Sequence, residues 1–250
     1  VYLNSFLEKQ FNLQYSHRFK DWSSLLAVHS TQPANRVDQD DDRFIDLPLL
    51  RRYSVYNKWQ KGNEAEWGFH SKIAWSYLDE SRVGGQIDFD PQIHEGKNQV
   101  YGQTVDIQQP SVYTKTGFRI DDVHYFNVIA SAFYQDQKSY YGLARYRGKQ
   151  LNAYANLQYE YAWKEKHNLK TGFSYRYQRL EENIGFNDDV LNRTYDGLYL
   201  KKESIPGLFA ENTFNWLDRK LVLITGLRAD HHQDFGWHWT PRALVKYQLG

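Results

Sequence analysis

The sequence has 250 residues, a formal net charge of +1 and no cysteine. These values exclude disulfides, thiolate metal sites and a global electrostatic attraction to nucleic acid, so we expect no nucleic-acid partner. The mean hydropathy is −0.77, yet 17% of the residues are aromatic. This combination is typical of transmembrane β-barrels, whose strands have one apolar and one wet face. The start, Val1-Tyr-Leu-Asn, lacks the features of a signal peptide, so we expect an internal stretch of a longer exported protein.

A period-two alternation of apolar and polar residues predicts β-strands along nearly the whole chain. In 169–178, for example, Phe173 and Tyr177 lie on one face and Lys170 and Arg176 on the other. The clearest segments are 11–19, 66–77, 151–163 and 169–178; weaker ones are 53–59, 112–120, 126–134, 208–216, 221–229 and 243–249, and 23–30 is a strand by composition. Their apolar sets contain no Lys, Arg, Asp or Glu, as a lipid-facing surface requires. We therefore expect about eleven strands, most of them long enough to cross a bilayer.

The connections between these strands alternate in length. Short ones are predicted at 20–22, 61–64, 121–123, 164–167 and 217–220, and long ones over about 32–50, 80–110, 135–148, 182–204 and 231–240. Tight turns on one side and long loops on the other predict an outer-membrane barrel with its turns in the periplasm. Five tryptophans beside the short turns fit a periplasmic aromatic belt: Trp22, Trp59, Trp67, Trp163 and Trp216. A soluble propeller or sandwich has the same strand alternation and stays an alternative.

An incomplete barrel would expose unpaired backbone groups to lipid at its open edges. Because about eleven strands need not close, we expect further strands from the rest of a longer chain. Association of several copies is the alternative.

Several segments resemble TonB-dependent outer-membrane receptors. The resemblance rests on the Phe-Ala-Glu strand start at 209–211, the Gly-Leu-Arg-x-Asp strand at 226–230 and the Pro-Arg strand entry at 241–242, with weaker similarity at 37–48 and 82–87 to cobalamin and siderophore receptors. It implies an all-β, transmembrane antiparallel meander β-barrel, with about eleven of roughly 22 strands present and the plug domain absent from this chain. Residues 1–250 would belong to the first half of the barrel domain.

The resemblance also implies a multi-pass protein of the cell outer membrane that takes up a scarce bulky nutrient, such as a ferric siderophore, cobalamin or another metal chelate. The implied partners are the TonB–ExbB–ExbD complex, reached through the plug, a small-molecule ligand and outer-membrane lipid; a surface lipoprotein is a further candidate. A passive porin-like channel is the alternative function. No nucleophile motif, phosphate-binding glycine loop or zinc signature is present, so we expect no enzyme.

Four aspartates form a candidate calcium site. Asp38, Asp40, Asp42 and Asp46 follow the spacing D-x-D-x-D-x-x-x-D, and oxygen ligands at alternate positions of a tight loop can surround one Ca²⁺. The pattern departs from an EF-type loop, because Arg43 replaces the glycine at the sharp turn and the twelfth position lacks a glutamate. The alternative is a solvated acidic loop among nearby arginines.

Three histidines form a second candidate site. His231, His232 and His238 lie at one predicted strand end and loop, with Asp230 and Asp234, and imidazole can bind copper, zinc or haem iron. The alternative is a set of loop histidines at a wet rim.

A basic inner surface is the third candidate. The strand alternation places Arg119, Arg176, Arg228 and Arg242 on the polar face, with Glu160, Glu211 and Asp230 among the acidic residues there. Such a surface could dock a plug or attract an anionic ligand. Ordinary ion pairing in a wet lumen is the alternative.

Overall fold

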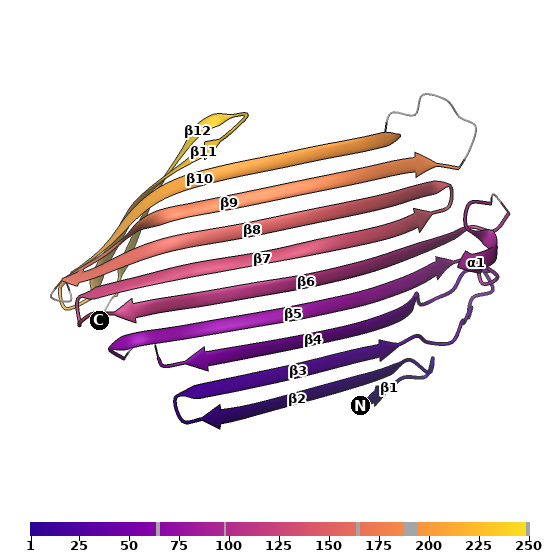
Figure 1. The fold of residues 1–250 in the computed structure, drawn as a ribbon, viewed down its shortest axis with the longest axis horizontal. Helices are drawn as coiled ribbons and strands as arrows, with labels where there is room; N and C mark the ends of the chain where they lie inside the picture. The colour runs from indigo at the N-terminus through magenta and orange to yellow at the C-terminus, as the bar shows by residue number, and fades with distance from the viewer. Residues whose placement is uncertain (64–65, 98, 164–165, 188–194, 249–250) are drawn as a thin grey trace.

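The computed structural model describes residues 1–63, 66–97, 99–163, 166–187 and 195–248. They form one 12-stranded sheet in which the strands lie in chain order and each pairs antiparallel with the next (Figure 1). The strands are β1 (Tyr2–Leu3), β2 (Lys9–Phe19), β3 (Trp22–Gln32), β4 (Leu49–Lys61), β5 (Gly68–Gly85), β6 (Gly102–Arg119), β7 (His124–Tyr141), β8 (Ala144–Trp163), β9 (His167–Phe186), β10 (Gly197–Trp216), β11 (Leu221–His232) and β12 (Gly236–Tyr247), with a short helix α1 (Pro91–His94) between β5 and β6. No helix in the described residues is long and apolar enough to cross a membrane. The predicted all-β meander is confirmed, with the two-residue β1 as an additional strand.

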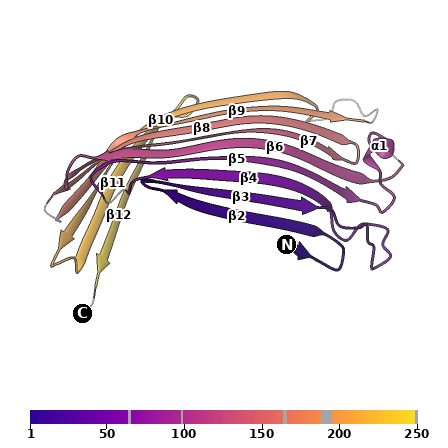
Figure 2. The same cartoon turned by 60° about the horizontal axis from the view of Figure 1, so that its bottom comes forward.

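The sheet is strongly curved but does not close. Figure 2 shows the strands arching from β2 at one edge to β11 and β12, which lie bent away from the plane of the first strands. In the described part of the chain β12 pairs only with β11, and β2 has only the two residues of β1 on its other side. A closed barrel in a membrane needs every such edge paired, so the sheet is one part of a barrel wall.

The strand register separates two faces along the whole sheet. Directly paired residues share a face, and the row Val128, Leu157, Phe173 and Leu208 runs across β7, β8, β9 and β10 without a bulge. We call the face of this row the outer face and the opposite one the inner face. Many large apolar side chains on the outer face are exposed, including Leu157 at 53%. Because no other part of the described structure covers them, this is the face that contacts lipid.

The uncharged stretches of the outer face show which part of each strand crosses the membrane. In β8 the outer-face residues are uncharged from Tyr161 to Leu151, and the next one is Lys149; in β9 they are uncharged from Leu169 to Tyr177, and Arg179 follows. These stretches match the roughly 9–11 residues of a tilted membrane-spanning strand, and we call them the membrane band. The tryptophans beside the short turns mark its lower limit, at the end that the sequence predicts to face the periplasm.

Four predicted long loops are wrong in extent, because the strands continue above the membrane band. The loop expected over 80–110 is shortened to 86–101, between β5 and β6. The loop expected over 135–148 is reduced to the two residues between β7 and β8, and the one over 231–240 to the three between β11 and β12. Much of 182–204 belongs to β9 and β10, although 188–194 lie outside the described residues. Above the membrane both faces of the sheet are exposed to water. The alternation of apolar and polar residues is therefore lost there, and the sequence resembles that of a loop.

The short turns predicted at 20–22, 121–123 and 217–220 agree with the structure. The connection predicted at 61–64 is longer, because β4 ends at Lys61 and β5 begins only at Gly68; residues 64–65 and 164–165 lie outside the described residues. In the β6–β7 turn the amides of Val123 and His124 donate to Asp121 Oδ1 at 2.8 and 2.7 Å. The Val123 bond above all keeps the pKa of this carboxyl below its ordinary value. Beside the neighbouring turns, Phe19 and Trp59 stack on the outer face with 6.1 Å between ring centroids.

Candidate functional site

The inner face is strongly basic. The strands β2–β12 place thirteen Lys or Arg and six Asp or Glu on it, although the whole chain has a net charge of only +1. The predicted basic residues Arg119, Arg176, Arg228 and Arg242 all lie on this face. A surface with this excess of positive charge attracts anions from the solvent that fills the lumen.

Arg228 is the centre of a polar cluster on the inner face of β9–β11. Its guanidinium donates to both carboxylate oxygens of Asp230 at 2.7 Å and to Ser174 Oγ at 2.7 Å. Gly207 on the strand between them has room for no side chain, because a Cβ there would lie 2.1 Å from Asp230 Oδ1. The strand register, with Gly207 opposite both Ser174 and Asp230, therefore holds this cluster together.

Two cavities on the inner face meet at Arg228. The upper one, of about 370 Å³, lies near the top of the membrane band and is lined by Tyr154, Arg176, Glu203, Arg228, His232 and His238 among others. The lower one, of about 340 Å³, includes Lys170, Glu211, Arg228 and Arg242. Arg242 forms an ion pair with Glu211, and Lys170 Nζ lies 3.6 Å from Glu160. The cavities thus form a continuous track of charged groups down the inner face of β8–β12.

A test of this packing is the replacement Gly207→Ala. We expect the new methyl group to displace Asp230 and break its bonds to Arg228, which lowers the free energy of unfolding by about 1–3 kcal/mol. Gly185→Ala is the matched control, because a Cβ there meets no atom of the described residues within 4 Å. Urea titration of the folded full-length receptor in detergent measures both; equal stability of the two variants would contradict the packing described here.

Another basic residue forms an aromatic contact near the periplasmic end. The Arg119 guanidinium lies 5.3 Å from the centroid of the Tyr125 ring, and the Tyr125 hydroxyl is 2.8 Å from His70 Nε2. His70 is buried and close to Gly117, where a Cβ would lie 2.6 Å from His70 Nε2. These inner-face groups form a packed polar layer.

The three histidines do not share a face. His231 is on the outer face, where its ring meets Trp237 with a centroid distance of 5.1 Å. His232 and His238 are on the inner face and line the upper cavity, with His232 Nε2 at 3.6 Å from Glu203 Oε1. Adjacent residues in a strand point to opposite sides, so His231 cannot join the other two at one metal.

The acidic loop does bring three of its four aspartates together. Ligand oxygens of Asp38, Asp40 and Asp42 lie within 4.8 Å of one another. Asp46 is not in this group; its carboxylate accepts the Gln39 amide at 3.2 Å. Arg43 adopts a φ of 69°, the left-handed conformation that glycine would favour at this position. The loop therefore makes the sharp turn without glycine.

The loop 86–101, which contains α1, is fastened to the outside of the barrel. Phe89 is fully buried against Gly102 and stacks on Tyr140, with 6.2 Å between ring centroids, and Glu95 lies 4.0 Å from Arg145. Gly102, Tyr140 and Arg145 are all on the outer face, above the membrane band. The same loop also joins the acidic loop, because Ile87 donates to the Arg43 carbonyl at 2.8 Å.

Several residues of the upper cavity were not predicted from the sequence. Glu203 lies within the segment predicted as a loop, and Tyr154 and Ser174 looked like ordinary polar strand residues. The alternation of Tyr154 and Ser174 with apolar neighbours indicated that both lie on the inner face. The alternation could not indicate the cavity, because the cavity depends on the register of five strands.

An antiparallel meander with a lipid-facing outer surface and a polar inner surface defines a transmembrane β-barrel. The family described as TonB dependent receptor-like, beta-barrel, matches residues 7–250, and the chain belongs to it. The protein is therefore a β-barrel of the outer membrane, and the predicted resemblance is confirmed. No curated protein matches the sequence.

Solved structures of the same fold are receptors and transporters. The siderophore receptor PirA from Pseudomonas aeruginosa has a TM-score of 0.59 at 11% identity, covering 97% of this chain and 37% of its own. The outer membrane transporter YddB from Escherichia coli has 0.65 at 10% identity, covering 96% and 36%. The ferric citrate transporter FecA in its unliganded form has 0.63 at 11% identity, covering 97% and 39%. This chain thus spans well under half the length of these proteins.

Proposed function

We propose that this chain is part of the barrel of a transporter that takes up a scarce, bulky metal chelate across the outer membrane. The observation that supports it is the charged track on the inner face of β8–β12, within a surface that has thirteen basic and six acidic residues. Such a surface suits an anionic chelate, such as a ferric siderophore, better than neutral or cationic solutes. Cobalamin and other metal chelates are the remaining candidates within this function.

Energy for uptake would come from the TonB–ExbB–ExbD complex, acting through a plug in the full-length protein. The family membership supports this partner. A passive porin-like channel is the second candidate, since a wet, charged lumen serves either function. A surface lipoprotein stays a predicted partner.

Growth rescue tests which substrate the transporter takes up. A strain that lacks its receptor genes is supplied with the full-length gene and then with single ferric siderophores or with cobalamin as the limiting nutrient. We expect growth on an anionic ferric chelate, and only while TonB is present. Growth that does not depend on TonB would favour the passive channel, and growth on cobalamin alone would contradict the anionic substrate.

Arginine variants test the role of the inner face. Arg176 is exposed on the inner face at the upper cavity, and Arg179, three residues further along β9, is exposed on the outer face beside Glu181. We expect Arg176→Gln to weaken binding of the anionic chelate about tenfold, the effect of losing one charged hydrogen bond. Arg179→Gln should leave it unchanged. Binding of radiolabelled chelate to whole cells measures both, and equal affinities would remove Arg176 from the ligand path.

We also propose that Asp38, Asp40 and Asp42 bind Ca²⁺. The proximity of the three carboxylates supports it, and the bound ion would stabilise a loop that pairs with 86–101 through Phe44 and Gln86. We expect Ca²⁺ to slow amide hydrogen exchange in both loops of the full-length receptor. Asp40→Asn should abolish this effect, while Asp46→Asn should preserve it. Exchange rates that do not respond to Ca²⁺ would leave the loop as a solvated acidic surface.

A further inference from the structure

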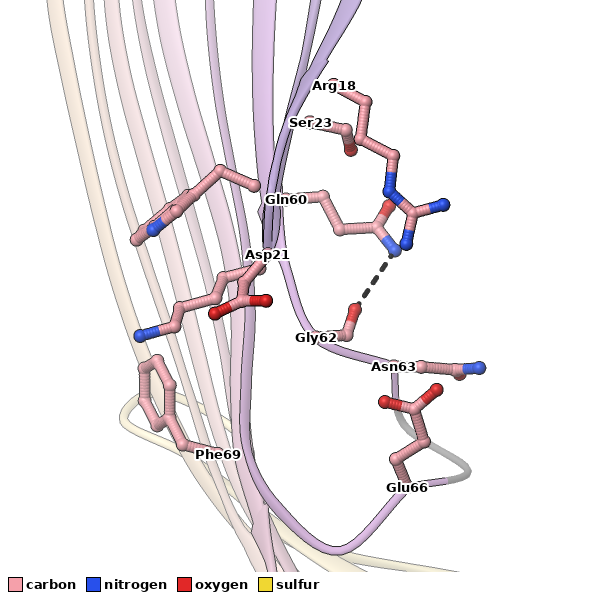
Figure 3. A pocket seen from close by; sticks show the side chains of 10 residues that line it. Arg18, Asp21, Ser23, Gln60, Gly62, Asn63, Glu66 and Phe69 are labelled. Carbon is pink, nitrogen blue, oxygen red and sulfur yellow. Dashed lines mark hydrogen bonds between the residues drawn. The ribbon is translucent and has the colours of Figure 1, made fainter.

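A third cavity lies at the periplasmic edge of the sheet, away from the charged track. It has a volume of about 570 Å³ and is formed where the β2–β3 turn ends beside the segment that joins β4 to β5. Figure 3 shows Asp21 and Phe69 on one side of this strand edge and Arg18, Gln60 and Asn63 on the other. The cavity therefore reaches from the inner face around the edge to the lipid-facing side.

Lys61 lies on the outer face of this cavity. It is the last residue of β4 and pairs directly with Trp22 of β3. Its ammonium group is 5.6 Å from the centroid of the Trp22 ring and 5.8 Å from that of Phe69. A cation that contacts two aromatic faces is attracted to both rings, so the position of its charge is restricted.

The height of Lys61 in the membrane is that of the lipid headgroups. The stacked rings of Phe19 and Trp59 lie beside it on the same face, next to the short turns. Aromatic side chains gather at the membrane–water interface, where lysine also extends its ammonium group toward the headgroups. A lipid phosphate of the periplasmic leaflet would thus lie within reach of Lys61.

We propose that this cavity binds the headgroup of a phosphatidylethanolamine molecule in the periplasmic leaflet. Lys61 contacts the phosphate, and the Asp21 carboxylate in the same cavity contacts the ethanolamine ammonium group. A peptide segment inside the lumen would meet Arg18 and Gln60, but it could not also contact Lys61 and Phe69, which point to the lipid. The two signs of charge on the outward side fit a zwitterionic headgroup better than a singly anionic one.

The test uses the full-length receptor in mild detergent with added phosphatidylethanolamine or phosphatidylglycerol, and native mass spectrometry measures the bound lipid. We expect Lys61→Gln to reduce bound phosphatidylethanolamine about fivefold, the effect of one interfacial cation on a lipid headgroup. Lys58→Gln is the matched control, because Lys58 lies on the inner face of the same strand. Asp21→Asn should remove the preference for phosphatidylethanolamine over phosphatidylglycerol.

Two results would overturn the proposal: undiminished lipid binding by Lys61→Gln, or an equal loss in Lys58→Gln, which would place the ligand in the lumen. Heat-modifiable migration of each variant on a gel confirms that it is folded. The proposal rests on the membrane location of the barrel and not on its substrate. Failure of the uptake experiments therefore leaves the proposal standing, and the lipid measurements decide it alone.

Discussion

Replacing Leu157 by arginine is expected to destabilise the folded barrel by about 2–4 kcal/mol, because the charge enters the middle of the lipid-facing surface. Leu157 lies halfway along the membrane band of β8 and is 53% exposed on the outer face. The next residue, Gln158, lies on the inner face and donates to Glu160 Oε1 at 2.7 Å. Gln158→Arg places the same charge beside a carboxylate in a wet lumen, so it should cost little.

Urea titration of the full-length receptor refolded into lipid vesicles measures both variants. The result depends on the assignment of the two faces, since the substituted residues are neighbours in sequence and equally deep in the membrane. Similar losses in stability for both variants would show that the outer face does not contact lipid. A larger loss for Gln158→Arg would show that the faces are reversed.

Replacing Phe89 by alanine is expected to release the loop 86–101 from the outside of the barrel. Truncation of a fully buried phenylalanine costs about 3–5 kcal/mol, and here the loss falls on one loop and not on the whole barrel. Amide hydrogen exchange in 86–101 should therefore become at least about a hundredfold faster, while exchange in β8 and β9 stays unchanged.

A second variant should release the same loop by displacing the Phe89 ring. A Cβ at Gly102 would lie 2.1 Å from the Phe89 ring, so Gly102→Ala should expel the ring and accelerate exchange in the same loop. Ile93→Ala is the control, since Ile93 is in α1 and 55% exposed. Slow exchange in both Phe89→Ala and Gly102→Ala would show that other contacts hold the loop.

The position of the loop 86–101 determines whether it could block the entry of a ligand into the barrel. The contacts of Phe89 and Glu95 are with outer-face residues of β6–β8, so they hold the loop beside the barrel and not over its opening. The charged track on β8–β12 lies on the opposite, inner face. Within the described residues, the loop therefore leaves the upper cavity uncovered.

The strand type, the two faces and the end of the sheet that has the short turns could all be predicted from the amino-acid sequence. Alternation such as that of Phe173 and Tyr177 with Lys170 and Arg176 reports which face each residue takes, because successive strand residues point to opposite sides. The tryptophans at the turns and the absence of charge on the apolar face both follow from the membrane, and they can be recognised in one strand at a time.

The ends of the strands and the contacts between charged groups could not be predicted, because both depend on the three-dimensional structure. Above the membrane both faces are wet, so the hairpin of β7 and β8 had no apolar alternation that could reveal it. Arg228 meets Ser174, which is 54 residues away in the sequence, because the registers of β9, β10 and β11 place Gly207 between them. Alternation within a strand assigns a face, whereas contact between strands depends on register, and register is set by the packing of the whole sheet.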